Sequence, residues 1–125
     1  MTHLDTSFLI RSLVAGTPEH TRLASWLKAN EPIAISAVCW TEFLCGPVSP
    51  QEAALAQQLL GTPLSFTAGD AALAARLFNG SGRRRGSLID CMVAAHAMSA
   101  NARLATSNRA DFQRLVPFGV QLADE

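Results

Sequence analysis

Short apolar runs alternate with longer segments of helical periodicity along the whole chain, and this alternation limits the fold more than any other feature. A strand, a helix and a further strand in succession favour right-handed crossovers and a parallel sheet covered by helices on both faces. The predicted strands are Thr2–Asp5, Ile33–Ser36, Leu64–Phe66, Arg103–Thr106 and Val120–Leu122.

Helical patterns fill most of the gaps between these strands. Ser36 is a candidate N-cap for the helix after the second strand, and Gly46 and Pro47 end that helix. Shorter helices are expected after Asp5 and Asn108. The longer predicted helices are Thr21–Ala29, Ala37–Cys45, Gln51–Leu60, Asp70–Phe78 and Leu88–Ala100.

The length and composition favour one domain. The chain has 125 residues, of which 49% are hydrophobic, and this is enough to build one core. No basic segment opens the chain, and the longest uncharged stretch, 53–69, is broken by Gln, Gly and Pro, so neither a signal peptide nor a membrane span is predicted. The three cysteines lack CxxC spacing. We expect residues 1–125 to form a single soluble, cytoplasmic domain with reduced thiols.

Three acidic residues lie in apolar surroundings, where exposure on a solvated surface explains them poorly. Asp5 ends the first predicted strand, Glu42 lies in the apolar helix AVCWTEFLCG, and Asp90 opens the last long helix. All three map to the carboxyl edge of the predicted sheet, where open α/β sheets bind ligands. Two carboxylates 4 Å apart repel each other by about 4 kcal/mol at an effective dielectric constant of 20. A bound divalent cation removes that repulsion, and oxygen ligands favour magnesium or manganese over zinc.

Each of these acids also has a simpler interpretation. Asp5 stands where an N-cap belongs, and Asp90 follows Ser87 at the spacing of a capping box. An arginine distant in sequence is an alternative partner for Glu42. The grouping of all three acids at one sheet edge favours a metal site over three separate structural roles.

A fourth segment, LATSNRADFQRL, adds polar residues at the same edge. Its strand ends at Thr106, and Asn108 is a candidate cap for a short helix that contains Asp111. Asn108 would supply a neutral carbonyl to the site, whereas Asp111 would add a charge and strengthen metal binding. The sequence leaves open which of the two completes the site.

Together, these four segments resemble the PIN-domain nucleases, and most closely the VapC-type toxins of bacterial toxin–antitoxin pairs. The resemblance covers nearly the whole chain, and many relatives carry an acid where this chain has Asn108. In the family, an acid and two hydroxyl or amide residues follow the first strand, a T-E-[FLI] motif lies in a helix, a third acid opens a helix rich in small residues, and T-x-[ND]-x-x-D-F comes last. The matching residues here are Asp5, Thr6 and Ser7; Thr41, Glu42 and Phe43; Asp90; and Thr106, Asn108, Asp111 and Phe112.

The resemblance implies a three-layer α/β/α PIN-like fold with a central, mainly parallel twisted sheet of about five short strands. It further implies an endoribonuclease in which water activated by Mg²⁺ or Mn²⁺ hydrolyses RNA phosphodiester bonds. Relatives are usually homodimers inhibited by a cognate antitoxin, and we expect both partners here. The implied metal ligands are Asp5, Glu42 and Asp90, with Asp111 as a further catalytic acid and Ser7, Thr106 and Asn108 as supporting residues.

The loop NGSGRRRGS places Arg83, Arg84 and Arg85 just before Asp90. These arginines are predicted to contact RNA phosphates beside the metal site, and a solvated loop is the simpler alternative. His96 is predicted to be an interior or interface residue of its helix rather than a catalytic base.

Other families that gather acids at strand ends fit less well. Receiver domains and haloacid-dehalogenase-like phosphatases need a lysine late in the chain, whereas the only lysine here is Lys28. A non-catalytic PIN-like module that binds RNA or protein is the remaining alternative, and the presence of Asp5, Glu42 and Asp90 argues against it.

Overall fold

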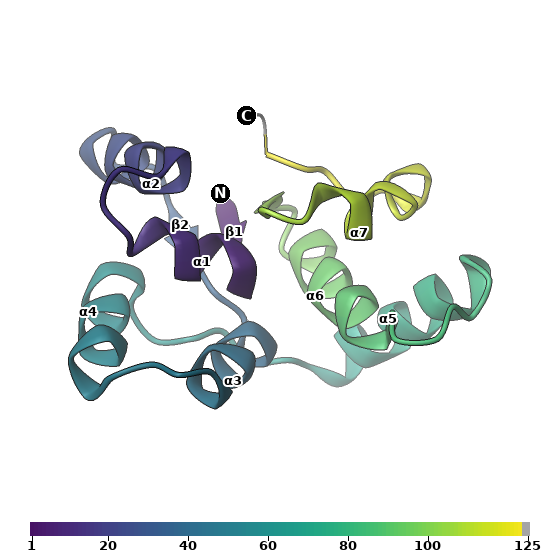
Figure 1. Cartoon of the computed structure of the whole chain (residues 1–125). Coiled ribbons are helices and arrows are strands. Elements are labelled where there is room, and N and C mark those ends of the chain that lie inside the picture. Colours follow the sequence, from purple (N-terminus) through teal and green to yellow (C-terminus); the bar gives the residue numbers. More distant parts are fainter. Residues whose placement is uncertain (124–125) are drawn as a thin grey trace.

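Three short parallel strands form the centre of the protein in the order β2-β1-β3. They are β1 (Thr2–Leu4), β2 (Ile33–Ala34) and β3 (Arg103–Ala105). The computed structural model describes residues 1–123. Figure 1 shows α2 and α4 to one side of the strands and α5 and α6 to the other. The predicted α/β class, with a parallel sheet between helices, is confirmed.

The two remaining predicted strands contribute one parallel bridge each. Leu64 pairs with Ser36 beyond β2, and Leu122 pairs with Leu104 beyond β3. The five predicted segments therefore line up side by side, although the outer two are shorter than expected. Pro63 offers one physical reason at the first edge, because it has no N–H group to donate to a ladder.

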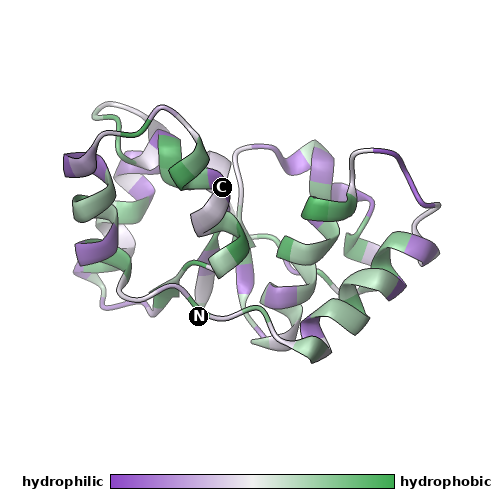
Figure 2. Ribbon diagram, turned by 90° about the horizontal axis from the view of Figure 1, so that it is seen from below, coloured by the Kyte–Doolittle hydropathy of each residue, from purple (hydrophilic) through white to green (hydrophobic). Residues whose placement is uncertain are grey.

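Eight helical segments connect or follow these strands within residues 1–123. Figure 2 shows apolar and hydrophilic residues alternating along the helices, as expected where one face of each helix packs on the core. The segments are α1 (Thr6–Ser12), α2 (Pro18–Lys28), α3 (Ala37–Cys45), α4 (Pro50–Leu60), α5 (Ala68–Gly80), α6 (Leu88–Ser99), α7 (Arg109–Gln113) and the 3₁₀ turn η1 (Val116–Phe118).

Helices α2 and α5 begin three and two residues earlier than periodicity alone predicted, because capping residues extend them. The Thr17 hydroxyl accepts a hydrogen bond from the His20 amide, and Pro18 occupies the first turn of α2. In the same way, Thr67 and Asp70 form a capping box that starts α5 at Ala68. Capping thus sets these boundaries, whereas apolar spacing shows only that the helices exist.

The core lies between the sheet and its helices. Leu4, Phe8 and Leu9 are fully buried where β1 passes into α1, and Leu104 is buried beside them on β3. The Phe8 ring stacks on Trp26 of α2, with ring centroids 5.5 Å apart. Packing of this segment on β3 and α2 holds the end of β1 in place.

His96 lies in the interior, as predicted. Its imidazole is buried against His3 of β1, with 3.3 Å between the two Nδ1 atoms, and its Nε2 lies 3.2 Å from the Ser65 carbonyl oxygen. Within residues 1–123, no helix has both the length and the apolar character needed to cross a membrane.

Candidate active site

Asp5 lies at the junction of β1 and α1 and is 6% exposed. Its Oδ1 accepts hydrogen bonds of 2.8 Å from the Phe8 amide and from the Ser7 hydroxyl. Asp5 is therefore an N-cap, and the same carboxylate also lines a pocket at the carboxyl edge of the sheet. The carboxylate of Asp5 thus caps α1 and faces the pocket at the same time.

Glu42 projects from α3 toward the start of α1. The Thr6 hydroxyl donates hydrogen bonds to Oε1 of Glu42 at 2.9 Å and to the Cys39 carbonyl oxygen at 3.2 Å. The prediction that solvent exposure explains Glu42 poorly is wrong, because Glu42 and its neighbour Thr41 are both exposed. Because Glu42 is solvated, its charge does not require an arginine partner, and within residues 1–123 Glu42 takes part in no salt bridge.

Asp90 is half-buried in the first turn of α6. The predicted capping box with Ser87 does not form, because the Ser87 hydroxyl instead donates to the Arg84 carbonyl oxygen at 2.7 Å. Ser87 has helical backbone angles, and its side chain makes no capping bond. The structural explanation of Asp90 thereby loses its main support.

Asn108 and Asp111 enter the same site from the loop after β3 and from α7. Asn108 precedes α7, but its side chain makes no capping bond. Its backbone amide instead donates to the Thr106 hydroxyl at 3.0 Å. Both Asn108 and Asp111 are exposed and line the pocket, so the structure brings both candidates to it.

These residues surround one pocket of about 340 Å³ that is partly open to solvent. They come from the start of α1, from α3, from α6 and from the β3–α7 segment, four regions far apart in sequence. The polar residues of the lining are Asp5, Thr6, Ser7, Glu42, Asp90, Asn108 and Asp111.

The carboxylates perturb one another in this pocket. Burial raises the pKa of Asp90 to about 6, and the negative charge of Asp111 adds to the shift. Glu42 and Asp5 raise the Asp90 pKa further, whereas Arg114 opposes them. Burial also raises the pKa of Asp5, while hydrogen bonds from Thr106 and from the Phe8 amide counteract that shift. A concentration of negative charge with this effect favours cation binding.

The donor set suits a hard divalent cation. The available ligand atoms are carboxylate, hydroxyl and amide oxygens. Within residues 1–123, however, no group of three or more Asp, Glu, His or Cys side chains is arranged so that it could hold a metal ion. The nearby Cys39 is buried, which raises its pKa to about 12, so its thiol stays protonated and adds no thiolate ligand.

The arginine loop divides into two parts. Arg84 and Arg85 line a second pocket that shares Asp90 and Asp111 with the first. Arg83 lies outside the lining of both pockets: its guanidinium bonds the Asn79 side chain and lies 5.6 Å from the Phe78 ring centroid.

Arg114 completes the lining of this second pocket and was missed in the sequence. It stands three residues after Asp111, a spacing that places both side chains on one face of a helical turn. Its charge lowers the pKa of Asp90. The three-residue spacing between Asp111 and Arg114 could have revealed Arg114 as a site residue. The sequence analysis considered only Asn108 and Asp111 in this segment.

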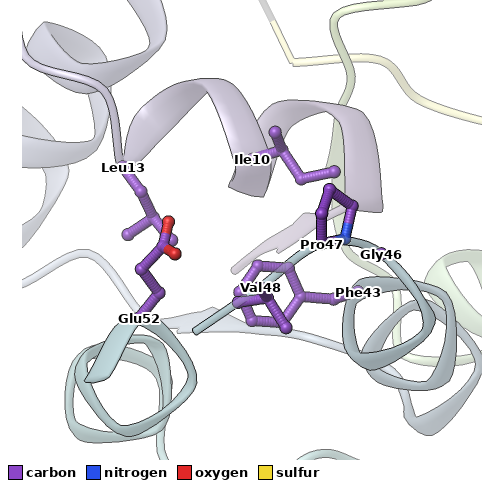
Figure 3. A pocket seen from close by; sticks show the side chains of 7 residues that line it. All are labelled: Ile10, Leu13, Phe43, Gly46, Pro47, Val48 and Glu52. Atoms are coloured by element: carbon purple, nitrogen blue, oxygen red, sulfur yellow. The ribbon is translucent and has the colours of Figure 1, made fainter. Parts of the chain in front are cut away.

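A separate hollow on α1, α3 and the start of α4 carries little chemistry. Figure 3 shows Ile10 and Leu13 facing Phe43, Pro47 and Val48 across it. The acid at its rim, Glu52, accepts a hydrogen bond of 3.0 Å from the Ser49 amide in a capping box. This hollow suits apolar contact rather than catalysis.

The family model described as PIN domain matches residues 3–116. The chain therefore belongs to the PIN domain family, and the resemblance inferred from its motifs is confirmed. No curated protein sequence matches the chain significantly.

Solved structures share the fold over almost the entire chain. VapBC2 from Rickettsia felis, bound to a DNA fragment from its promoter, has a TM-score of 0.77 at 21% identity, covering 99% of this chain and 98% of that chain. VapBC-1 from nontypeable Haemophilus influenzae has a TM-score of 0.74 at 22% identity, covering 98% and 96%. VapC20 from Mycobacterium tuberculosis, a sarcin-ricin loop cleaving toxin, has a TM-score of 0.61 at 17% identity, covering 85% and 87%.

Proposed function

We propose that this chain is a metal-dependent endoribonuclease that acts as the toxin of a toxin–antitoxin pair. The observation that carries the proposal is the convergence of Asp5, Glu42, Asp90 and Asp111 on one pocket, where neighbouring charge helps to raise the pKa of Asp90 to about 6. Four acids from four separate elements have no common structural task, and their mutual repulsion opposes folding. A function that requires concentrated negative charge explains why they are together.

In this proposal, Asp5, Glu42 and Asp90 hold Mg²⁺ or Mn²⁺. When held there, such an ion would lower the pKa of a bound water and neutralise charge on the attacked phosphate. Asn108 and Asp111, which follow β3, face the same pocket and complete its polar lining. Thr106 and Ser7 support the proposed ligand Asp5. Hydrogen bonds from both hydroxyls lower the pKa of Asp5 and so favour its charged form.

The comparisons support the toxin role. VapC20 is described as a toxin that cleaves the sarcin-ricin loop, and the VapBC proteins share this fold at similar length. Arg84 and Arg85 beside the acidic pocket suit a polyanionic substrate such as RNA. Because its substrate is cellular RNA, we place this protein in the cytoplasm.

The decisive experiment is cleavage of total cellular RNA by the purified chain with Mg²⁺ or Mn²⁺. We expect discrete fragments that disappear with EDTA and with Asp5→Asn. Glu52→Gln is the matched control, because Glu52 lies outside the acidic pocket and glutamine preserves its capping box. Cleavage that survives EDTA, or that Asp5→Asn leaves unchanged, overturns the proposed mechanism.

A non-catalytic PIN-like binding module is the alternative function. Titration with Mn²⁺ separates the two, because the nuclease requires saturable binding that Asp5→Asn weakens. A folded chain that neither binds Mn²⁺ nor cleaves RNA, but still retains RNA or a protein partner, would support the alternative.

An antitoxin and a second copy of this chain are the proposed protein partners. The hollow of Figure 3 and the exposed Ile10, Val14 and Leu44 offer apolar surface for a protein partner. Sedimentation of the purified chain tests the homodimer, for which a monomeric profile counts against the proposal. Co-expression with the neighbouring operon product tests the antitoxin, and undiminished cleavage in its presence counts against that pairing.

A further inference from the structure

We infer that Arg114, together with Arg84 and Arg85, forms a phosphate-binding subsite that holds the RNA backbone beside the four carboxylates. This inference rests on the proposed ribonuclease function and adds to it a specific contact with the substrate. The three arginines line one pocket of about 370 Å³, and Asp90 and Asp111 form its border with the acidic pocket.

The strongest observation is the state of the Arg114 guanidinium. Its Nη1 donates to the Asp111 carbonyl oxygen at 2.9 Å. Its Nε and Nη2 are buried and have no hydrogen-bond acceptor within residues 1–123. These two nitrogens form one edge of the guanidinium plane, and that edge matches two oxygens of a carboxylate or phosphate. Buried donors are normally paired, so this edge is available to an anion once the side chain turns toward the pocket that Arg114 lines.

Charge in this pocket favours the binding of one further anion. Asp90 and Asp111 already border the pocket, and the charge of Asp111 raises the pKa of Asp90. Three arginines face two acids in this pocket, so it has room in charge for one further anionic group. Under the proposed function, the polyanion that reaches the pocket is RNA, and its phosphate supplies that group.

The structure also separates Arg83 from its two neighbours. Arg83 has a positive φ of 54° and is held by Asn79 and by the face of the Phe78 ring. It therefore shapes the loop, whereas Arg84 and Arg85 line the pocket. Arg83 therefore serves as an internal control for Arg84 and Arg85. The same substitution should weaken RNA binding at the two pocket positions but not at Arg83.

The test measures binding of a fluorescein-labelled, single-stranded 12-nucleotide RNA in EDTA, which prevents metal-dependent cleavage, over a series of salt concentrations. We expect Arg114→Gln to weaken binding roughly tenfold and to reduce the salt slope by about 1. Arg84→Gln and Arg85→Gln should each weaken binding about threefold. Arg83→Gln and the control Arg76→Gln, an exposed residue outside the linings of both pockets, should both stay within about twofold of the wild type.

Arg114→Lys distinguishes phosphate binding from a purely structural role. Lysine keeps the charge but loses the two-donor edge, so its salt slope should match the wild type while its affinity falls about threefold. Equal loss of thermal stability in the Lys and Gln variants with an unchanged salt slope would assign Arg114 to the fold alone and overturn the inference.

Two further results separate this inference from the proposed function. Wild-type affinity and salt slope in Arg114→Gln, in a chain that still cleaves RNA, overturn the subsite and leave the nuclease intact. Loss of RNA binding in Arg114→Gln, in a chain that never cleaves RNA, supports the subsite and overturns the nuclease. A wild-type chain without measurable RNA binding at low salt also overturns the subsite.

Discussion

The Ser7 hydroxyl donates a 2.8 Å hydrogen bond to Oδ1 of Asp5 and thereby joins this acid to the loop after β3. The same hydroxyl accepts a 3.0 Å hydrogen bond from the Ser107 amide. One side chain thus fixes the orientation of the carboxylate and satisfies a backbone donor 100 residues further along the chain. Asp5 is positioned by tertiary contact as well as by its own helix.

Ser7→Ala should therefore affect both stability and metal binding. It leaves the Ser107 amide without its acceptor, which costs about 1 kcal/mol in the free energy of unfolding. It also removes a donor to Asp5, and loss of such outer contacts weakens metal affinity roughly tenfold. Urea unfolding and calorimetric Mn²⁺ titration measure the two effects. Ser25→Ala on the exposed face of α2 is the control, and equal behaviour of the two variants contradicts the prediction.

The pKa of Asp90 should respond in opposite directions to two neighbouring substitutions. The charge of Asp111 raises this pKa, so Asp111→Asn should lower it from about 6. The charge of Arg114 lowers it, so Arg114→Gln should raise it. Carbon-13 NMR titration of the metal-free protein measures the carboxyl directly. Shifts of the same sign in both variants would show that the cluster is not coupled in this way.

Asp90→Asn should stabilise the metal-free protein at neutral pH. The folded pKa of Asp90 is about 6, above the ordinary value of 3.8, so the folded state holds this proton more tightly. Stability is therefore lost as the pH rises from about 4 to 6, and asparagine removes that loss. After a discount for solvent screening at this half-buried site, we expect a gain of about 1 kcal/mol at pH 7 in chemical denaturation. Destabilisation at pH 7 with no change at pH 4 would contradict the prediction.

His3 should make the protein sensitive to mild acid. Burial lowers its pKa from 6.5 to about 4, and His96 contributes to the shift. The unfolded chain therefore binds the proton more readily, so stability is complete above pH 6.5 and falls as the pH drops toward 4. The loss should approach about 2 kcal/mol.

His3→Gln should flatten this dependence when the free energy of unfolding is measured between pH 4 and 7. The control is His20→Gln, because His20 is exposed on α2, and it should keep the wild-type slope. An unchanged slope in His3→Gln would assign the acid sensitivity to other groups.

The order of strands and helices, the sheet edge that holds the site and the acids at that edge follow from the sequence alone. Apolar spacing and capping are local properties that the sequence shows directly. Because parallel strands have their carboxyl ends at the same edge of a sheet, the sequence also predicts that Asp5 and Asp111 lie close together. The four motifs needed only their order and spacing to indicate the family, and the family model confirms it.

Tertiary structure decided what each polar side chain contacts. Ser87 has the spacing of a capping box with Asp90, yet its hydroxyl donates to the Arg84 carbonyl oxygen. A local sequence pattern shows which hydrogen bonds are possible but does not show which of them forms. Glu42 proved to be exposed, since periodicity does not show how much of a helix its neighbours cover. Arg114 lies near Asp90 because α7 packs against α6. Such contacts depend on the relative placement of elements far apart in the chain, and no local pattern specifies that placement.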